Sequence, residues 1–443
     1  MIKLSSHFTY KKIIKFTLPS IAMMMFTSIY GIVDGLFVSN FAGDIPFKAI
    51  NLIMPFLMIL GTVGFMFGTG GTAIVAKKLG EWNLKKANEY FSLFTYITLI
   101  LGIIFSILGI VFMKPISILL GAEGEILNNC ILYGRIILLA LPFLVLQYLF
   151  QSFMIAAEKP KLGLYVTIIA GCTNMILDAI LVMFLPKELK IAGAAIATAF
   201  SQFLGGVIPL IYFLTNKTTD LKLGKTKFQL KPIVKACFNG SSEFMSNVSM
   251  NIVGMIYNLQ LIKYAGDDGI AAYGVMMYVS FIFASTFIGY SIGCAPIVSY
   301  NFGAKNFEEL KNIRRKGIIL VGITGLLMVL VAELFAIPFS KMFVSYNQEL
   351  LKMTVHGFRI FAISFPFMGY AIFGSCFFTA LNDGITSAII SFLRTLVFQI
   401  AAVIFLPLIY ELDGIWASVV VAELFAVIFT ILFLIIKRKK YNY

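Results

Sequence analysis

Charge is scarce in this 443-residue sequence: Asp, Glu, Lys and Arg make up 13% of the residues, 60% are hydrophobic, and the mean hydropathy is +0.93. A soluble domain carries roughly a quarter charged residues and about half apolar ones. The missing charge leaves long apolar runs, such as 97–113, 164–185, 317–338 and 415–436. Each run can cross an apolar layer about 30 Å thick, so the composition excludes a soluble globular protein and predicts a membrane protein.

Histidine and cysteine are also rare, and the common catalytic motifs are absent. The two histidines, His7 and His356, lie far apart in the sequence, and the five cysteines show neither metal-binding nor disulfide spacing. No P-loop, His-Glu-x-x-His motif or nucleophile elbow with its partners occurs. We therefore expect that the chain is not an enzyme and needs no cofactor.

The apolar runs predict transmembrane helices, because backbone polar groups in lipid must be bonded within their own segment. We expect an all-α polytopic membrane protein with twelve transmembrane helices in two six-helix bundles around a central cavity. The first span is too long for a signal peptide, so we expect no cleaved leader. The predicted spans are 14–40, 48–75, 91–113, 128–152, 162–185, 192–215, 233–262, 270–298, 317–338, 353–380, 385–407 and 414–436.

The net charge of +14 follows the predicted topology. If residue 1 lies on the inner side, 25 of the 35 Lys and Arg residues fall on inner segments, 7 on outer segments and 3 within spans. This bias places both termini in the cytoplasm and anchors the protein to anionic headgroups of the lipid bilayer. It predicts no nucleic-acid binding, and we expect a monomer in a bacterial inner (plasma) membrane.

The sequence contains an internal repeat. Residues 70–83, GGTAIVAKKLGEWN, match residues 293–306, GCAPIVSYNFGAKN, at an offset of 223, and FAGD at 41–44 matches YAGD at 264–267. Six spans per repeat is an even number, so both halves enter the membrane in the same orientation. We expect an N-terminal bundle over 1–215, a cytoplasmic linker over 216–235 and a C-terminal bundle over 236–443.

Four oxygen-bearing residues are predicted to lie at one depth near the outer side. Asp34 lies about seven residues, or roughly 10 Å, from the outer end of the first span. Asp178 has the same depth on the fifth span, Asn174 stands one turn from it, and Thr198 lies at a similar level on the sixth. The four could bind a hard cation such as Na⁺, and two nearby carboxylates could instead share a proton. Separately paired structural acids are the alternative.

The repeat provides an internal comparison. The residues that correspond to these four in the second half are Tyr257, Thr395, Gln399 and Val419. The carboxylates therefore occur in the first half alone, which favours a specialised role over a role in helix packing.

Other intramembrane residues are candidates for the cavity and for substrate contact. Charged side chains in a membrane are costly, and they are functional candidates by default. Glu243 lies in the inner half of the seventh span with no basic residue of its own span close by, and for Glu423 we expect a buried hydrogen-bonded role. Gln202, which corresponds to Glu423, is a further candidate, together with Tyr257. Methionines such as Met175 and Met255 offer a soft surface suited to varied apolar ligands.

Taken together, the motifs GIVDGLFVSNFAG (31–43), GTGGTAIVAKKLGEWN (68–83) and IGCAPIVSYNFGAKN (292–306), with the Asn174-x-x-x-Asp178 pair, resemble the multidrug and toxic compound extrusion (MATE) family along nearly the whole chain. The resemblance implies two bundles in a V about a central cavity. It also implies a cation-coupling site at Asp34, Asn174, Asp178 and Thr198, and assigns the family's glutamate of the seventh span to Glu243. Some members carry an Asp in the tenth span, but residues 365–380 contain no acid, which puts a second-half cation site in doubt.

The resemblance implies a secondary antiporter that exports cationic or lipophilic small molecules in exchange for inward Na⁺ or H⁺. Two alternatives stay open on sequence alone. One is a flippase of lipid-linked saccharides, although the chain has few intramembrane arginines to hold phosphates. The other is a membrane scaffold or sensor that binds ligands without moving them.

Overall fold

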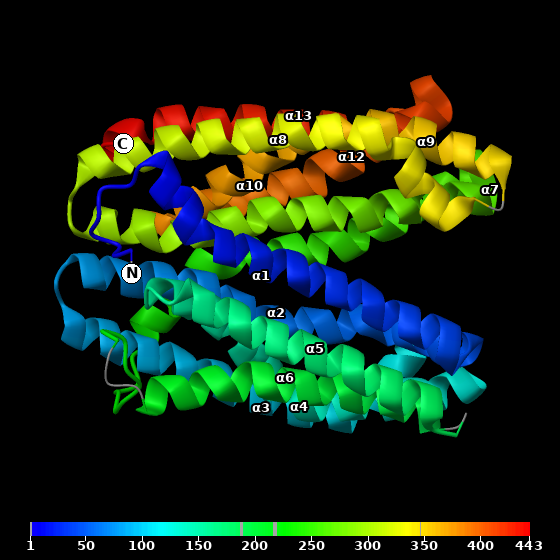
Figure 1. The fold of residues 1–443 in the computed structure, drawn as a ribbon, viewed down its shortest axis with the longest axis horizontal. Helices are drawn as coiled ribbons and strands as arrows, with labels where there is room; N and C mark the ends of the chain where they lie inside the picture. The colour runs from blue at the N-terminus through cyan, green and yellow to red at the C-terminus, as the bar shows by residue number, and fades with distance from the viewer. Residues whose placement is uncertain (1, 187–188, 216–218, 346) are drawn as a thin grey trace.

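The computed structural model describes residues 2–186, 189–215, 219–345 and 347–443, and these residues are almost entirely helical, with no strand among them (Figure 1). The predicted all-α fold is confirmed. The first half contains α1 (Tyr10–Phe37), the π-helical turn η1 (Val38–Ala42), α2 (Asp44–Gly80), α3 (Leu84–Leu119), α4 (Gly124–Ala156), α5 (Pro160–Phe184) and α6 (Lys190–Thr215). The second half contains α7 (Leu230–Gly303), α8 (Phe307–Val344), α9 (Gln348–Ala362), α10 (Phe365–Ala380), α11 (Gly384–Phe392), the π-helical turn η3 (Leu393–Val397), α12 (Phe398–Phe405), α13 (Pro407–Ile436) and α14 (Arg438–Tyr441).

The described helices form twelve membrane spans. Ten helices are long and apolar enough to cross a membrane, and α9 with α10, bent by 45° at their junction, make an eleventh span. The 74 residues of α7 would reach about 110 Å if straight, far beyond a bilayer. Gly266 breaks α7 with φ 61° and ψ −151°, and Tyr257 stacks on Tyr273 across this break with ring centroids 5.1 Å apart. The two arms of α7, 230–265 and 267–303, are therefore two antiparallel spans.

Backbone geometry repeats between the halves at the offset found in the sequence. Gly43 and Gly266, the glycines of FAGD and YAGD, both have positive φ, which lets the chain turn back sharply after the first and seventh spans. Trp82 and Lys305 share a left-handed conformation at the next turn, with φ of 60° and 57°. Residues aligned by the repeat thus occupy equivalent turns, as expected of a duplicated scaffold.

The segment between the halves is bound to α3. The Asn88 side chain donates to the Asp220 carbonyl and accepts from the Lys222 N–H, at 3.1 and 2.7 Å, and Ser92 Oγ accepts from the Gly224 N–H at 3.0 Å. Residues 216–218 of the linker predicted over 216–235 lie outside the described residues. Lys187, which was counted among the outer basic residues, also lies outside them. Residues 230–235 already belong to α7, because Pro232 is tolerated in the first turn of a helix.

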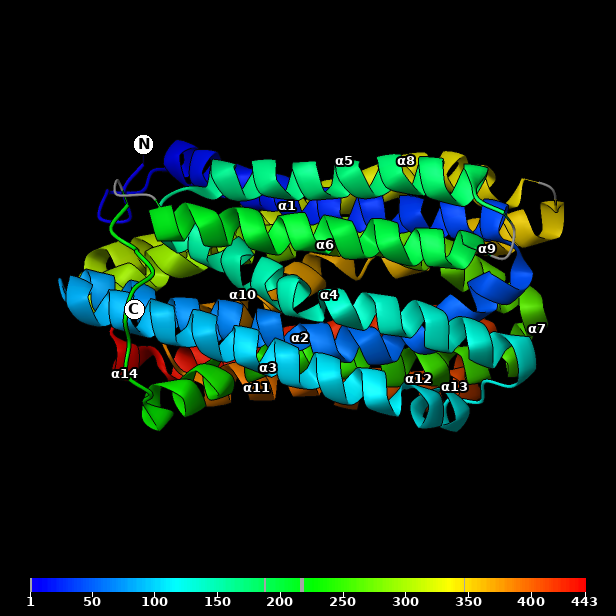
Figure 2. The same cartoon turned by 90° about the horizontal axis from the view of Figure 1, so that it is seen from below.

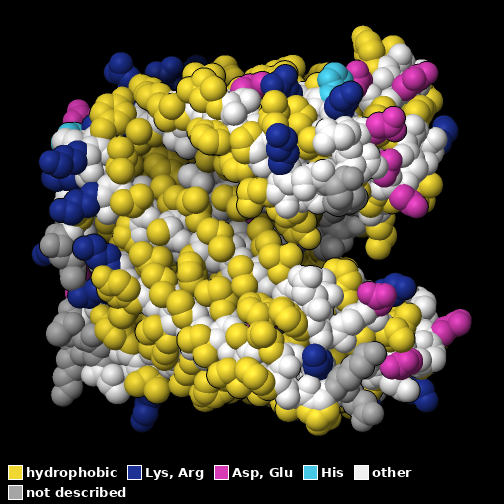
Figure 3. Space-filling model, turned by 45° about the vertical axis from the view of Figure 1, so that its right-hand side comes forward, with side chains coloured by type: hydrophobic (Ala, Val, Ile, Leu, Met, Phe, Trp, Pro, Cys, Tyr) yellow, Lys and Arg dark blue, Asp and Glu magenta, His cyan; other side chains and the backbone are white. Residues whose placement is uncertain are grey.

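The two bundles meet at the end of the molecule where both termini lie, here called the termini end (Figures 1 and 2). Glycines allow the close approach: Gly80 of α2 lies against the Tyr300 backbone of α7, and Gly303 of α7 lies against the Lys77 backbone of α2. These two contacts are equivalent under the repeat. At the opposite end, here called the open end, the bundles separate and leave a hollow between them (Figure 3).

Candidate functional site

The N-terminal bundle brings the four predicted oxygen-bearing residues together. Asp34 comes from α1, Asn174 and Asp178 lie one turn apart on α5, and Thr198 comes from α6, which packs beside α5. The Asn174 Nδ2 atom donates to Thr198 Oγ1 at 3.4 Å. The Asp34 side chain lies close enough to both Asp178 and Asn174 to form a hydrogen bond if a proton is available. We call Asp34, Asn174, Asp178 and Thr198 the N-bundle cluster.

The cluster contains buried oxygen atoms without a protein donor. Asp178 is fully buried and Asn174 is 1% exposed. Oδ1 of Asp34, both carboxylate oxygens of Asp178 and Oδ1 of Asn174 accept no hydrogen bond from the described residues. Buried polar atoms are normally satisfied, and a buried carboxylate without a partner is especially unfavourable. The donor set of two carboxylates, an amide oxygen and a hydroxyl therefore fits a proton or a small hard cation.

Two tyrosines beside the cluster were not identified from the sequence. Tyr133 of α4 is 1% exposed and lies next to Thr198 and both acids. Tyr30 lies one turn before Asp34 on α1 and is close to Gln147 of α4. The i, i+4 spacing of Tyr30 and Asp34 could have indicated the first tyrosine. No sequence signal connects Tyr133 to the cluster, because that contact depends on how α4 packs.

The C-terminal bundle fills the equivalent position with a neutral pair. Tyr257 corresponds to Asp34 and Gln399 to Asp178, and the Tyr257 hydroxyl donates to Gln399 Oε1 at 2.9 Å. Tyr257 is 1% exposed, so the structure places this predicted cavity residue inside the bundle rather than on a cavity wall. Tyrosine and glutamine satisfy each other at this place. Among the described residues, no donor satisfies the Asp178 carboxylate of the N-bundle cluster in this way.

The other predicted cavity residues are spread over both bundles. Glu243 on the first arm of α7 is half-buried, and Arg394 is the cation near it. Gln202 on α6 is 9% exposed, and its Oε1 atom accepts no hydrogen bond from the described residues. Met175 on α5 is partly exposed, and Met255 on α7 is 63% exposed.

A buried ion pair lies within the C-terminal bundle. Arg394 Nε, on the π-helical turn η3, donates to both carboxylate oxygens of Glu423, at 3.0 and 2.8 Å. The two side chains are 15% and 3% exposed. This contact gives Glu423 the buried hydrogen-bonded place expected from the sequence. Its partner is Arg394, one of the three basic residues within the predicted spans, but this pairing was not predicted from the sequence.

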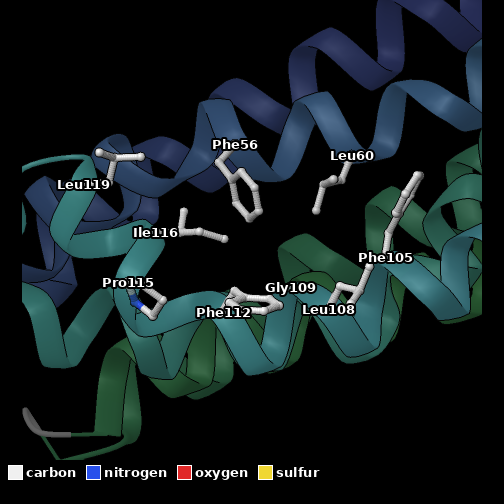
Figure 4. A pocket seen from close by; sticks show the side chains of 9 residues that line it. All are labelled: Phe56, Leu60, Phe105, Leu108, Gly109, Phe112, Pro115, Ile116 and Leu119. Carbon is white, nitrogen blue, oxygen red and sulfur yellow. The ribbon is translucent and has the colours of Figure 1, made fainter.

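An apolar recess of about 440 Å³ lies apart from these residues, between α2 and α3 (Figure 4). Its lining includes Phe56, Leu60, Phe105 and Phe112, together with Pro115 near the end of α3. None of the predicted site residues contributes to the recess. It is a lateral groove in an apolar part of the surface, and the side chains that line it are all apolar.

Comparison with known proteins adds sequence relatives over most of the chain. A family model, MatE, matches residues 19–180 and 244–404. The multidrug export protein MepA of Staphylococcus haemolyticus (strain JCSC1435) is 29% identical over 372 residues, which cover 81% of this chain and 80% of that protein. MepA of Staphylococcus aureus (strain MRSA252) is 25% identical over 418 residues, 94% of this chain and 91% of that protein.

Solved structures show the same fold. A crystal structure of MATE in complex with MaL6 superposes with a TM-score of 0.93 and 20% sequence identity, covering 98% of both chains. A multidrug resistance MATE family transporter of the MOP superfamily in the outward-facing conformation gives a TM-score of 0.92 and 20% identity, covering 98% of this chain and 97% of that one. The expected arrangement of two six-helix bundles is therefore confirmed.

Proposed function

The chain belongs to the MatE family of multidrug efflux transporters, and from this premise we propose that it is an antiporter that exports cationic or lipophilic small molecules in exchange for inward Na⁺ or H⁺. It is a multi-pass membrane protein and not an enzyme. The exchanged cation binds at Asp34, Asn174, Asp178 and Thr198.

The N-bundle cluster is the observation that carries this proposal. Four of its buried oxygens accept no hydrogen bond from the described residues, so a proton or cation beside them would stabilise the cluster. Two neighbouring carboxylates repel each other when both are ionised. One bound proton or cation removes most of this electrostatic repulsion. A site of this kind changes its charge each time the cation binds or leaves. A coupled transporter needs such a change of charge, because it makes the state of the protein depend on whether the cation is bound.

α1 transmits the change to the rest of the molecule. It carries Asp34, contains Pro19 and is followed directly by the π-helical turn η1. A proline inside a helix removes a backbone hydrogen bond, and π-helical turns often mark functional positions. α1 packs on α5 within its own bundle and on α7 of the other bundle. Cation binding at Asp34 therefore acts on a helix that packs on both bundles.

The substrate binds in the hollow between the bundles. The candidates for substrate contact are Glu243 on α7, Gln202 on α6, and Met175 and Met255, whose adaptable apolar side chains are at least partly exposed. The excess of Lys and Arg in the predicted inner segments supports a cytoplasmic position for the termini end, with the open end facing outward. A monomer is sufficient for this arrangement.

Reconstitution into liposomes tests the proposal. A cationic dye is loaded, and Na⁺ and pH gradients are imposed separately at zero membrane potential. We expect at least one gradient to drive dye movement in the opposite direction, and dissipation of that gradient with a specific ionophore to abolish it. Dye binding without gradient-driven flux would contradict antiport and would favour a scaffold or sensor.

A further inference from the structure

Residues 2–9, which precede α1, are packed into the protein. Leu4 is 1% exposed and Phe8 is fully buried. Both belong to an apolar cluster that also contains α7, α8 and α10 residues of the C-terminal bundle, such as Ile297, Leu310 and Phe377. This segment leads into the N-terminal bundle, yet its apolar side chains are buried largely against the other bundle.

The backbone of Leu4 is held by both bundles at once. Its N–H donates to Glu158 Oε1 at 2.7 Å, and its carbonyl accepts from Asn301 Nδ2 at 3.5 Å. Glu158 lies in the turn between α4 and α5 of the N-terminal bundle, whereas Asn301 lies on α7 of the C-terminal bundle. One peptide segment therefore connects the two bundles at the end where they meet.

Glu309 of α8 binds this segment through both of its carboxylate oxygens. It is 6% exposed, and its Oε1 accepts from the Phe8 N–H at 2.9 Å, while its Oε2 contacts His7 Nδ1 at 2.6 Å. The Phe8 carbonyl accepts from Asn312 Nδ2 at 3.0 Å and from Lys316 Nζ at 2.7 Å. Hydrogen bonds to charged groups are stronger than those between neutral groups. The contact of this segment with α8 is therefore the stronger of its two attachments.

The contact with Glu158 is the weaker side. It is a single hydrogen bond, made by a residue in a left-handed turn with φ 61°. Burial raises the pKa of the Glu158 carboxyl, and the hydrogen bond from Leu4 offsets only part of this effect. Asp220 nearby adds like charge, which Lys3 and Lys159 oppose. Glu158 is thus where the connection breaks at the smallest cost.

We propose that residues 2–9 form a latch that holds the two bundles together at the termini end and is released from Glu158 whenever that end opens. The segment stays on α8 through Glu309, Asn312 and Lys316 as the bundles separate. This inference rests on the proposed function, because a transporter that works by alternating access must open the end that is closed here.

The rate of cysteine labelling at the closed end tests the latch. Thr17 of α1 is fully buried against Gly293 of α7, so a single cysteine there (Thr17→Cys, native cysteines removed) reacts with a maleimide only when the bundles part. We expect Glu309→Ala and Glu158→Ala each to raise this rate about tenfold, the range of one charge-assisted hydrogen bond. The double variant should not exceed the faster single one by much, because both residues hold one segment.

Two controls make the result decisive. Glu308, next to Glu309 on α8 but exposed, is the matched control, and Glu308→Ala should leave the rate unchanged. Native Cys130, buried within the N-terminal bundle, reports general loosening when it is retained as the sole cysteine. Unchanged labelling at position 17, or an equal rise at Cys130, would overturn the proposal. Glu309→Gln provides a milder second variant. The assay needs no cation gradient, so a failure of antiport would be seen separately.

Discussion

At the scale of single residues, the two bundles carry different chemistry at equivalent positions, most clearly at two of them. The N-terminal bundle has Asp34 and Asp178, whereas the C-terminal bundle has Tyr257 and Gln399, which satisfy each other through a 2.9 Å hydrogen bond. Both pairs lie on equivalent helices of a duplicated scaffold. Of these two pairs, only the acidic one consists of groups that can be ionised at neutral pH, so the two halves share an architecture while one half alone carries carboxylates at these positions.

The Arg394–Glu423 pair gives a prediction at this scale. Replacing Arg394 by Gln leaves the Glu423 carboxylate buried without its cation, and breaking a buried pair in this way typically costs about 3–5 kcal/mol. We expect a large loss of thermal stability, measured by fluorescence-detected size-exclusion chromatography after heating. The double variant Arg394→Leu with Glu423→Leu should recover most of it. A single variant as stable as the parent would show that the pair contributes little.

Sequence reasoning reached some of these residues and not others. Equal depth on three predicted spans was enough to place Asp34, Asp178 and Thr198 together, because a helix has a fixed rise per residue. The pairing of Arg394 with Glu423 was not predicted, since it requires knowing how α12 and η3 face α13. Nor could Glu158 and Glu309, more than 140 residues apart, be connected to residues 2–9 without the fold.

At the scale of elements, the contact of α2 with α7 closes the termini end. Gly80 and Gly303 lie against the backbone of the opposite helix, at positions where a Cβ atom would collide with a carbonyl group. The sequence around Gly80, GTGGTAIVAKKLG, is rich in small residues, which let helices approach closely. It did not show that the partner belongs to the other bundle. Because these are packing contacts between glycine and backbone, the two helices can separate and pack again at these positions without breaking hydrogen bonds there.

Gly80→Ala and Gly303→Ala test this contact. Alanine is the better helix former by roughly 1 kcal/mol, so any loss must come from the collision, and overpacking typically costs about 1–3 kcal/mol. We expect faster maleimide labelling of Thr17→Cys in both variants. Gly254 on α7 has open space around it, so Gly254→Ala is the matched control and should not change the rate. Equal rates in all three variants would contradict a closing role for α2 and α7.

At the scale of the whole molecule, the closed end and the open end are opposite one another, and the N-bundle cluster lies within one of the two bundles. The glycine contacts and residues 2–9 hold the termini end, and the hollow opens at the other (Figure 3). α1 spans this distance, with Thr17 at the closed contact and Asp34 in the cluster. A change of charge at Asp34 therefore acts on the same helix that is packed into the closed contact. If a cation binds at the N-bundle cluster as proposed, this arrangement links its binding to the bundle interface through a single helix.

Gradient-driven efflux by variants of the cluster tests the central claim most directly. In proteoliposomes that carry a cationic dye, we predict that Asp178→Asn and Asp34→Asn reduce cation-driven efflux by at least about tenfold, within the usual range of coupling free energies. Asp44→Asn, which neutralises an exposed acid at the start of α2, should retain the parent rate. Undiminished gradient-driven efflux by folded Asp178→Asn protein would contradict the account.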